Sequence, residues 1–154
     1  MRFHQVKELV SWAADFHRRM ADYYGERAAS GVEDRVRMAL DYLAERERKL
    51  QADLEGYLDD GSDHSSVLET WFDDPADFPH PPVLERLPEA GDGDSVQGVL
   101  ATALTAHRML QDLYAHRGEL ASGRDEKQFF EALAAGHEAE VRRVARDIQR
   151  LEDY

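Results

Sequence analysis

Two similar stretches decide the fold of this chain: VSWAADFHRRMADYYGER at residues 10–27 and LATALTAHRMLQDLYAHR at residues 100–117. Aligned 90 positions apart, they share His-Arg, Asp, Tyr and Arg at matching places. In both stretches apolar residues recur three, four and seven positions apart, which is the spacing of one face of an α-helix. The same offset aligns Leu43-Ala44 with Leu133-Ala134. The sequence therefore predicts a duplicated helical hairpin.

Turn signals bound four long helical segments. The first hairpin covers residues 3–58 and turns at Ser30-Gly31, where glycine suits the left-handed conformation that ends a helix. The second hairpin covers residues 95–152 and turns at Ser122-Gly123. Asp94 and Ser95 are the candidate N-caps of its first helix. We expect helices of about 40 Å over residues 3–29, 33–58, 95–121 and 125–151.

The segment that joins the hairpins, residues 59–94, has a different composition. It holds all five prolines of the chain and many Asp, Gly and Ser residues. A connection of this length is unusual in a compact domain, and crossing from one end of a helical bundle to the other would explain it. We therefore predict one all-α domain over residues 1–154, in which this segment is a crossover.

Apolar residues in the crossover indicate that it packs along the bundle. Trp71, Phe72 and Phe78 complete the core if they are buried and form an interface if they are exposed. The sequence Ser66-Val67-Leu68-Glu69 fits a capping box, which predicts a short helix over residues 67–72. A second short helix is expected over residues 82–87.

Composition excludes several functional classes. The chain has 154 residues, 42% of them hydrophobic, and a formal net charge of −13, which disfavours nucleic acid and anionic membranes as partners. It has no cysteine, which removes disulfides, thiolate catalysis and Cys-ligated metals. No apolar run reaches about 18 residues, the length needed to span a membrane. The N-terminal stretch lacks a signal-peptide core, so a cytoplasmic location is expected.

Four ionisable residues lie near the middle of the apolar face of the four helices, one on each. A buried charge without a partner costs several kcal/mol, so such groups are normally paired or bind a metal. The midpoints of packed helices share one level, which lets side chains at those positions converge. The sequence thus predicts a central polar site formed by His17, Glu47, His107 and His137.

A duplicated helical hairpin with a long crossover resembles the ferritin-like fold, in particular its rubrerythrin-like branch. The resemblance implies a four-helix bundle in which each hairpin supplies a Glu from its first helix and a Glu-x-x-His from its second. In that family a Tyr commonly follows the first Glu by seven residues, and here Tyr24 follows His17 and Tyr114 follows His107. The family pattern Leu-Ala-x-x-Glu-x-x-His corresponds to residues 43–50 and 133–140.

The chain departs from this family at most ligand positions. His17 and His107 replace carboxylates, and Leu50 replaces a His. In the second motif, His137 and Glu140 invert the Glu-x-x-His order. A register shifted by one residue would match Glu138 to the family's Glu and Val141 to its His, but Glu138 lies less centrally on the apolar face than His137. A carboxylate-bridged di-iron centre is therefore not expected, and ferroxidase, peroxidase and oxygenase activities do not carry over.

Two interpretations of the site remain open. In the first, imidazoles and a carboxylate hold one divalent ion such as iron, zinc, manganese or copper, with an open position for water or dioxygen. Glu140 then serves as a fifth ligand or an outer acceptor, and the two tyrosines donate hydrogen bonds to a ligating carboxylate. The residues concerned are His17, Glu47, His107, His137, Glu140, Tyr24 and Tyr114.

In the second interpretation the metal has been lost, and the same histidines and Glu47 form a buried hydrogen-bonded layer that specifies the packing of the bundle. Replacement of a ligand by Leu50 favours this view. At the level of function, a metal-dependent redox or hydrolytic enzyme competes with a non-catalytic bundle that acts through its surface, and with a metal store or sensor. By resemblance to ferritin-like hairpins, a homodimer is expected.

Overall fold

The computed structural model describes residues 3–59, 64–72 and 95–153. Over these ranges the chain is all-helical, as predicted, and an isolated bridge between Gln5 and Trp71 is its one β-type contact. None of the described helices is long and apolar enough to cross a membrane. The helices are α1 (Val6–Ala28), α2 (Asp34–Leu58), the one-turn α3 (Ser65–Leu68), α5 (Val96–Leu120) and α6 (Arg124–Glu152).

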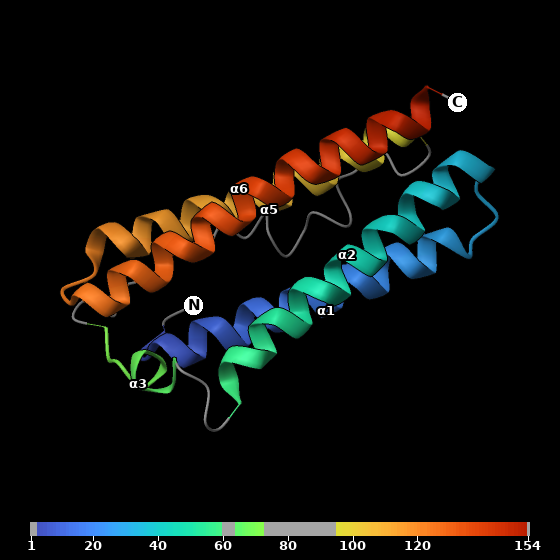
Figure 1. Cartoon of the computed structure of the whole chain (residues 1–154). Coiled ribbons are helices and arrows are strands. Elements are labelled where there is room, and N and C mark those ends of the chain that lie inside the picture. The colour runs from blue at the N-terminus through green and yellow to red at the C-terminus, as the bar shows by residue number, and fades with distance from the viewer. Residues whose placement is uncertain (1–2, 60–63, 73–94, 154) are drawn as a thin grey trace.

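The four long helices form two hairpins (Figure 1). Helix α1 packs along α2, and α5 packs along α6. The hairpins meet mainly through α2, which contacts both α5 and α6. The short helix α3 lies at one end, against α1, α2 and α6. This arrangement places the central parts of all four long helices within reach of one another.

Helix α1 begins three residues later than the sequence pattern suggests. Its N-cap is Gln5, and Oε2 of Glu8 accepts the backbone N–H of Gln5 at 2.8 Å, so Glu8 satisfies a donor that the helix leaves unpaired. Phe3 precedes the helix but is still buried and packs against Trp12 with ring centroids 5.9 Å apart. Apolar periodicity thus extends one turn beyond the hydrogen-bonded helix.

The two Ser-Gly turns have different geometries. Gly31 has a φ of 83°, the left-handed conformation expected of it, two residues beyond the C-cap of α1. Gly123 has a φ of −103° and is the N-cap of α6, so this turn needs no left-handed residue. Ser95 caps α5 as predicted, because its Oγ accepts the backbone N–H of Gly98 at 2.9 Å. Asp94 lies outside the described residues.

The described part of the crossover is partly core and partly surface. Helix α3 starts at Ser65 with His64 at its N-cap and no side-chain cap, so the predicted capping box at Ser66 is wrong. Trp71 is 65% exposed, whereas Phe72 is 6% exposed and lies under the guanidinium of Arg117, 3.8 Å from the ring centroid. Phe78 and the helix expected over residues 82–87 lie outside the described residues.

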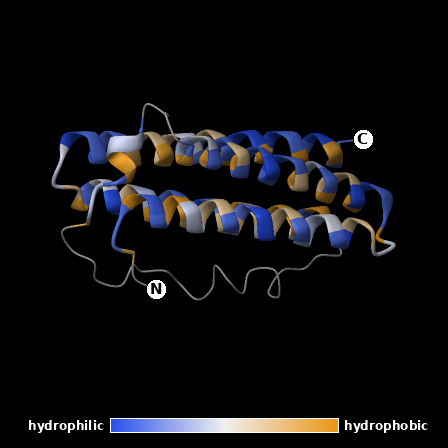
Figure 2. Ribbon diagram, turned by 90° about the horizontal axis from the view of Figure 1, so that it is seen from below, coloured by the Kyte–Doolittle hydropathy of each residue, from blue (hydrophilic) through white to orange (hydrophobic). Residues whose placement is uncertain are grey.

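The core lies between the helices along their full length. Each long helix alternates hydrophobic and hydrophilic residues (Figure 2), as amphipathic helices do. Alanines that are fully buried, such as Ala13, Ala39 and Ala103, let the helix backbones approach closely. Larger buried side chains such as Leu40 and Leu110 each contribute about 1.5–3 kcal/mol when removed from water. The polar site sits inside this apolar core.

Candidate functional site

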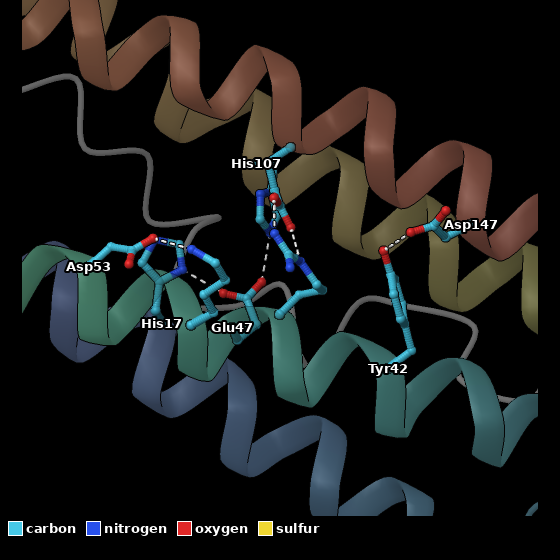
Figure 3. Close-up of polar contacts among 9 residues, drawn as sticks. His17, Tyr42, Glu47, Asp53, His107 and Asp147 are labelled. Atoms are coloured by element: carbon cyan, nitrogen blue, oxygen red, sulfur yellow. Dashed lines mark hydrogen bonds and ion pairs between the residues drawn. The ribbon is translucent and has the colours of Figure 1, made fainter.

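The structure brings together the four central side chains that the sequence predicted. His17 comes from α1, Glu47 from α2, His107 from α5 and His137 from α6, and none is more than 5% exposed. Figure 3 shows Glu47 between His17 and His107. We call these four residues the polar layer. Their convergence follows from their places near the helix midpoints.

Glu47 is the centre of the polar layer. Its Oε2 accepts a hydrogen bond from Nδ1 of His17 at 2.5 Å, and its Oε1 accepts one from Nε2 of His107 at 2.7 Å (Figure 3). One carboxylate therefore bonds to its own hairpin through α1 and to the other hairpin through α5. Each oxygen of this buried carboxylate therefore accepts a hydrogen bond from an imidazole, which satisfies its hydrogen-bonding capacity away from water.

The electrostatics of Glu47 and His107 are those of a buried ion pair. Burial by itself raises the pKa of Glu47, but the positive charges and hydrogen bonds of His107 and His17 outweigh it and hold that pKa well below its usual value. Burial likewise opposes protonation of His107, and the charge and hydrogen bond of Glu47 overcome it and raise the pKa of His107. Glu47 is therefore ionised at neutral pH.

His137 makes ring contacts rather than hydrogen bonds in the polar layer. Its ring stacks on Tyr114 with centroids 5.3 Å apart and on His17 with centroids 5.5 Å apart, and it meets His107 edge-on at 5.3 Å. Burial, followed by the charges of His17 and His107, lowers the pKa of His137 well below its usual value. This imidazole is therefore neutral at pH 7.

Five buried polar atoms of the site have no hydrogen-bond partner among the described residues: Nε2 of His17, Nδ1 of His107, Nδ1 of His137 and the hydroxyls of Tyr24 and Tyr114. Neither hydroxyl donates to a carboxylate, in contrast to the role expected for the two tyrosines. Leaving a buried polar group unsatisfied costs about 1–3 kcal/mol. The layer is thus well paired at Glu47 and poorly paired around it.

Glu140 lies beside the polar layer and is bound by a cation. Its two carboxylate oxygens accept hydrogen bonds from Nε and Nη2 of Arg46, each at 2.7 Å. A two-pronged contact of this kind is the strongest form of Arg–carboxylate pairing. A second contact, from the hydroxyl of Tyr42 to Asp147 at 2.6 Å, lies along the same face of α2 and α6. Sequence spacing gave no sign of either pair, because their members are 94 and 105 residues apart.

Burial distinguishes the two sequence registers considered for α6. His137 is 5% exposed, whereas the neighbouring Glu138 is exposed and pairs with Arg142 one turn along the helix. The register that turns His137 inward is therefore the observed one. In α2 the equivalent of Glu140 is Leu50, which is partly buried and lies at the edge of a cavity.

The polar layer does not have the donors of a di-iron centre. Such a centre needs several bridging carboxylates. Glu47 is the one carboxylate in the layer, and both of its oxygens already accept hydrogen bonds from imidazoles. Glu140 is committed to Arg46. Within the described ranges no three His, Asp or Glu side chains are arranged to hold a metal ion. The residues present therefore do not fit the di-iron group that the family resemblance implies.

Comparison with known proteins adds no further constraint. No protein-family model, no curated protein and no solved structure matches the chain.

A cavity of about 290 Å³ adjoins the polar layer between α2 and α6. His17 and His137 form part of its wall, and Arg46, Lys49 and Arg143 supply cationic groups. The sequence pattern gave no sign of this cavity. Gly136, beside His137, is one of the residues that line it, and an added Cβ there would meet no atom within 4 Å.

Proposed function

We propose that this protein is a non-catalytic, ferritin-like four-helix bundle in which former metal-ligand positions have become a structural layer between two duplicated hairpins. The observation that carries the proposal is the position of Glu47, whose two oxygens accept hydrogen bonds from His17 and His107. The 90-residue repeat of the hairpins supports the ferritin-like part.

The polar layer has a physical role under this proposal. A buried ion pair adds little net stability compared with apolar packing, but it strongly disfavours arrangements that leave one charge alone. Because Glu47 contacts one imidazole in each hairpin, sliding or rotating one hairpin against the other would separate the charges of Glu47 and His107. The layer therefore fixes the register in which the hairpins pack.

The surface is then where the protein acts. Among the described residues three large apolar side chains are exposed: Met38, Trp71 and Leu120. We extend the proposal to a homodimer that covers such side chains, as the resemblance to ferritin-like hairpins implies. Sedimentation velocity of wild type and Trp71→Ser tests this part. A wild-type monomer at all concentrations contradicts it.

Elemental analysis of the purified, untagged protein tests the main proposal. We expect less than stoichiometric metal both as isolated and after incubation with iron, manganese or zinc followed by gel filtration. About one metal ion per chain, lost in the double variant His17→Ala/His137→Ala, would contradict it. The matched control is His4→Ala/His116→Ala, which removes two histidines of exposed segments from outside the layer.

One observation favours a second candidate, a single metal ion bound by His17, His107 and His137. Each of these rings has one nitrogen without a partner, and Glu47 accepts from the opposite nitrogen of two of them. Carboxylates often orient ligating histidines in this way. The ring centroids are 5.3–6.0 Å apart, but the rings would have to turn for their free nitrogens to meet at one ion. The same elemental analysis decides between the candidates.

A further inference from the structure

The seam between α2 and α6 is filled in one half by long side chains. The guanidinium of Arg46 binds Glu140, and the hydroxyl of Tyr42 donates to Asp147. Two planar groups, a guanidinium and a phenol ring, therefore bridge the two helices here. The 90-residue repeat relates this half of the seam to the other half, because each position of α2 has a counterpart in α6.

The other half of the seam opens into the cavity of about 290 Å³. Gly136 and Ala132 line it, and they are the counterparts of the arginine at position 46 and the tyrosine at position 42. Leu50 also lines it and is the counterpart of the glutamate at position 140. The cavity is thus open where the second repeat lacks two large side chains. Because Leu50 replaces the glutamate that would bind a guanidinium, an apolar planar group matches this space better than a cation does.

The exposure of the lining residues orders the cavity by depth. Leu54 is 4% exposed and lies deepest among the leucines, whereas Leu50 and Leu133 are partly buried. The charged side chains of Lys49 and Arg143 are exposed and form the rim. At about 290 Å³ the cavity lies just below the range of ligand pockets, which begins at roughly 300 Å³. It therefore has room for one large side chain rather than for a cofactor.

Trp71 is an exposed aromatic side chain on a rigid support. Among the described residues three large apolar side chains are exposed, and Trp71, at 65%, is the one aromatic member. Its backbone forms the isolated bridge with Gln5, and the N–H of Phe72 donates to the carbonyl of His4 at 2.8 Å. These contacts hold Trp71 beside the start of α1, and it does not line the cavity of its own chain.

The rim of the cavity is cationic, and the sequence around Trp71 is acidic. Arg143 has no ion-pair partner among the residues that the structure describes, and Lys49 makes only a weak, exposed pair with an aspartate one turn along α2. Glu69 is exposed two residues before Trp71, and Asp73-Asp74 follows in the sequence. An apolar cavity with a cationic rim thus complements an aromatic side chain with acidic neighbours.

We propose that Trp71 of one copy of this chain enters the cavity between α2 and α6 of a second copy, and that the contact is reciprocal. The inference rests on the homodimer of the proposed function and assigns its interface. Both features lie toward one end of the bundle, because α3, which ends three residues before Trp71, contacts α2 and α6, and its N-cap His64 packs on Tyr57 of the cavity wall. One two-fold axis therefore serves both contacts.

Sedimentation velocity of the full-length protein over a dilution series tests the proposal with the cavity blocked. Gly136→Leu places a side chain at the cavity without a clash and improves helix propensity, so its melting temperature should not fall. We expect this variant to raise the dimer dissociation constant at least tenfold, as loss of a buried Trp contact does at interfaces. Gly56→Leu, which is also exposed on a helix with an open Cβ site but lies outside the cavity, is the control and should dimerise as wild type does.

The outcomes separate this inference from the proposal on which it rests. A dimeric wild type that is matched by both leucine variants overturns the interface assigned here and leaves the homodimer standing. A wild type that is monomeric at all concentrations overturns both.

A mixture of two variants tests reciprocal insertion directly. Trp71→Ser lacks the indole but keeps the cavity, whereas Gly136→Leu keeps the indole but has a blocked cavity. Each variant alone should dimerise at least tenfold more weakly than wild type. An equimolar mixture restores one of the two contacts, so it should associate more strongly than either variant alone. No gain in the mixture contradicts insertion of Trp71 into the cavity, because two variants that were merely misfolded would not rescue each other.

The role of the cationic rim is tested at Arg143 against its neighbour. Arg143→Glu should weaken the dimer about threefold or more, because it replaces an unpaired rim cation by an acid that faces the acidic surroundings of Trp71. Arg142→Glu changes the net charge equally, and Arg142 is exposed, pairs with Glu138 and does not line the cavity. An equal loss in both variants shows repulsion between whole chains and contradicts the role given to the rim.

Discussion

Glu47 and His137 hold equivalent positions in the two halves of the repeat, yet they behave in opposite ways. Glu47 is ionised and makes two hydrogen bonds, whereas His137 is neutral and makes ring contacts. One turn along, Leu50 lines an apolar cavity wall, while its counterpart Glu140 is bound to Arg46. A buried layer has room for one carboxylate balanced by imidazoles, so the second hairpin had to supply a neutral group at the same level.

The largest loss of stability is expected from Glu47→Gln, which removes the charge that distinguishes Glu47 from His137. The amide has one acceptor where the carboxylate has two, and it leaves His107 without its counter-ion. We expect a loss of about 3 kcal/mol in the free energy of unfolding, measured by urea denaturation. Glu45→Gln, on an exposed position of the same helix, should change stability by less than about 0.5 kcal/mol. Equal effects of the two substitutions would rule out a special role for Glu47.

The second largest loss of stability is expected from a substitution at Glu140, in the second hairpin. Glu140→Leu makes the second hairpin resemble the first at this position, but it leaves the partly buried Arg46 unpaired. We expect a cost of about 2 kcal/mol. The double variant Arg46→Met/Glu140→Leu removes both charges and should recover most of that loss in the same denaturation experiment. If the stability losses of the single variants Arg46→Met and Glu140→Leu simply add in the double variant, the pair does not couple α2 to α6.

The pH dependence of stability should separate the two histidines of the second hairpin. His137 has a pKa lowered from the ordinary value of 6.5 by burial, so the unfolded chain binds a proton that the folded protein does not, and stability falls as pH drops below 6.5. His107 has a raised pKa, so its contribution is complete below 6.5 and is lost at higher pH. Glu47 adds a further loss below its ordinary value of 4.5.

We therefore expect stability to fall by about 1 kcal/mol per pH unit between pH 6.5 and 5. Thermal melts across this range, monitored by circular dichroism, measure it. The variant His137→Phe should flatten the curve above pH 5 and keep the fall below pH 4.5. A curve unchanged by this substitution would mean that another group causes the loss.

The smallest effect is expected from His137→Phe at pH 7. The phenyl ring keeps the contacts with Tyr114 and His17 and removes a nitrogen that has no partner within the described structure. Stability should stay within about 1 kcal/mol of wild type, on either side. The same change at His107 removes the donor to Glu47 and should cost several times more. A large loss in His137→Phe would show that this imidazole has a bond partner in solution, such as water or a metal ion.

The sequence predicted the positions of the site better than its bonds. Apolar periodicity and the 90-residue repeat located the helices and the four residues of the polar layer, because the face of a helix depends on spacing alone. The partner of each polar atom depends on side-chain rotamers and on contacts between distant residues, such as Arg46 with Glu140. The sequence therefore could not show that Glu140 is paired with Arg46, or that the hydroxyls of Tyr24 and Tyr114 have no hydrogen-bond partner among the described residues.

Local turn chemistry and empty space were predicted least well. Two Ser-Gly pairs look alike in sequence, yet Gly31 is left-handed and Gly123 is an extended N-cap. The cavity beside Leu50 arises from what neighbouring helices fail to fill. Such a space is a property of packing, and no single residue type encodes it.

The polar contacts of α2 also bear on the order of folding. Three of them join the hairpins, from Glu47 to His107, from Arg46 to Glu140 and from Tyr42 to Asp147, across 60, 94 and 105 residues of chain. Contacts within each hairpin close much shorter loops and form faster. We therefore expect both hairpins to assemble first and to dock in a later, slower step, in which α2 recognises the second hairpin as one protein recognises another.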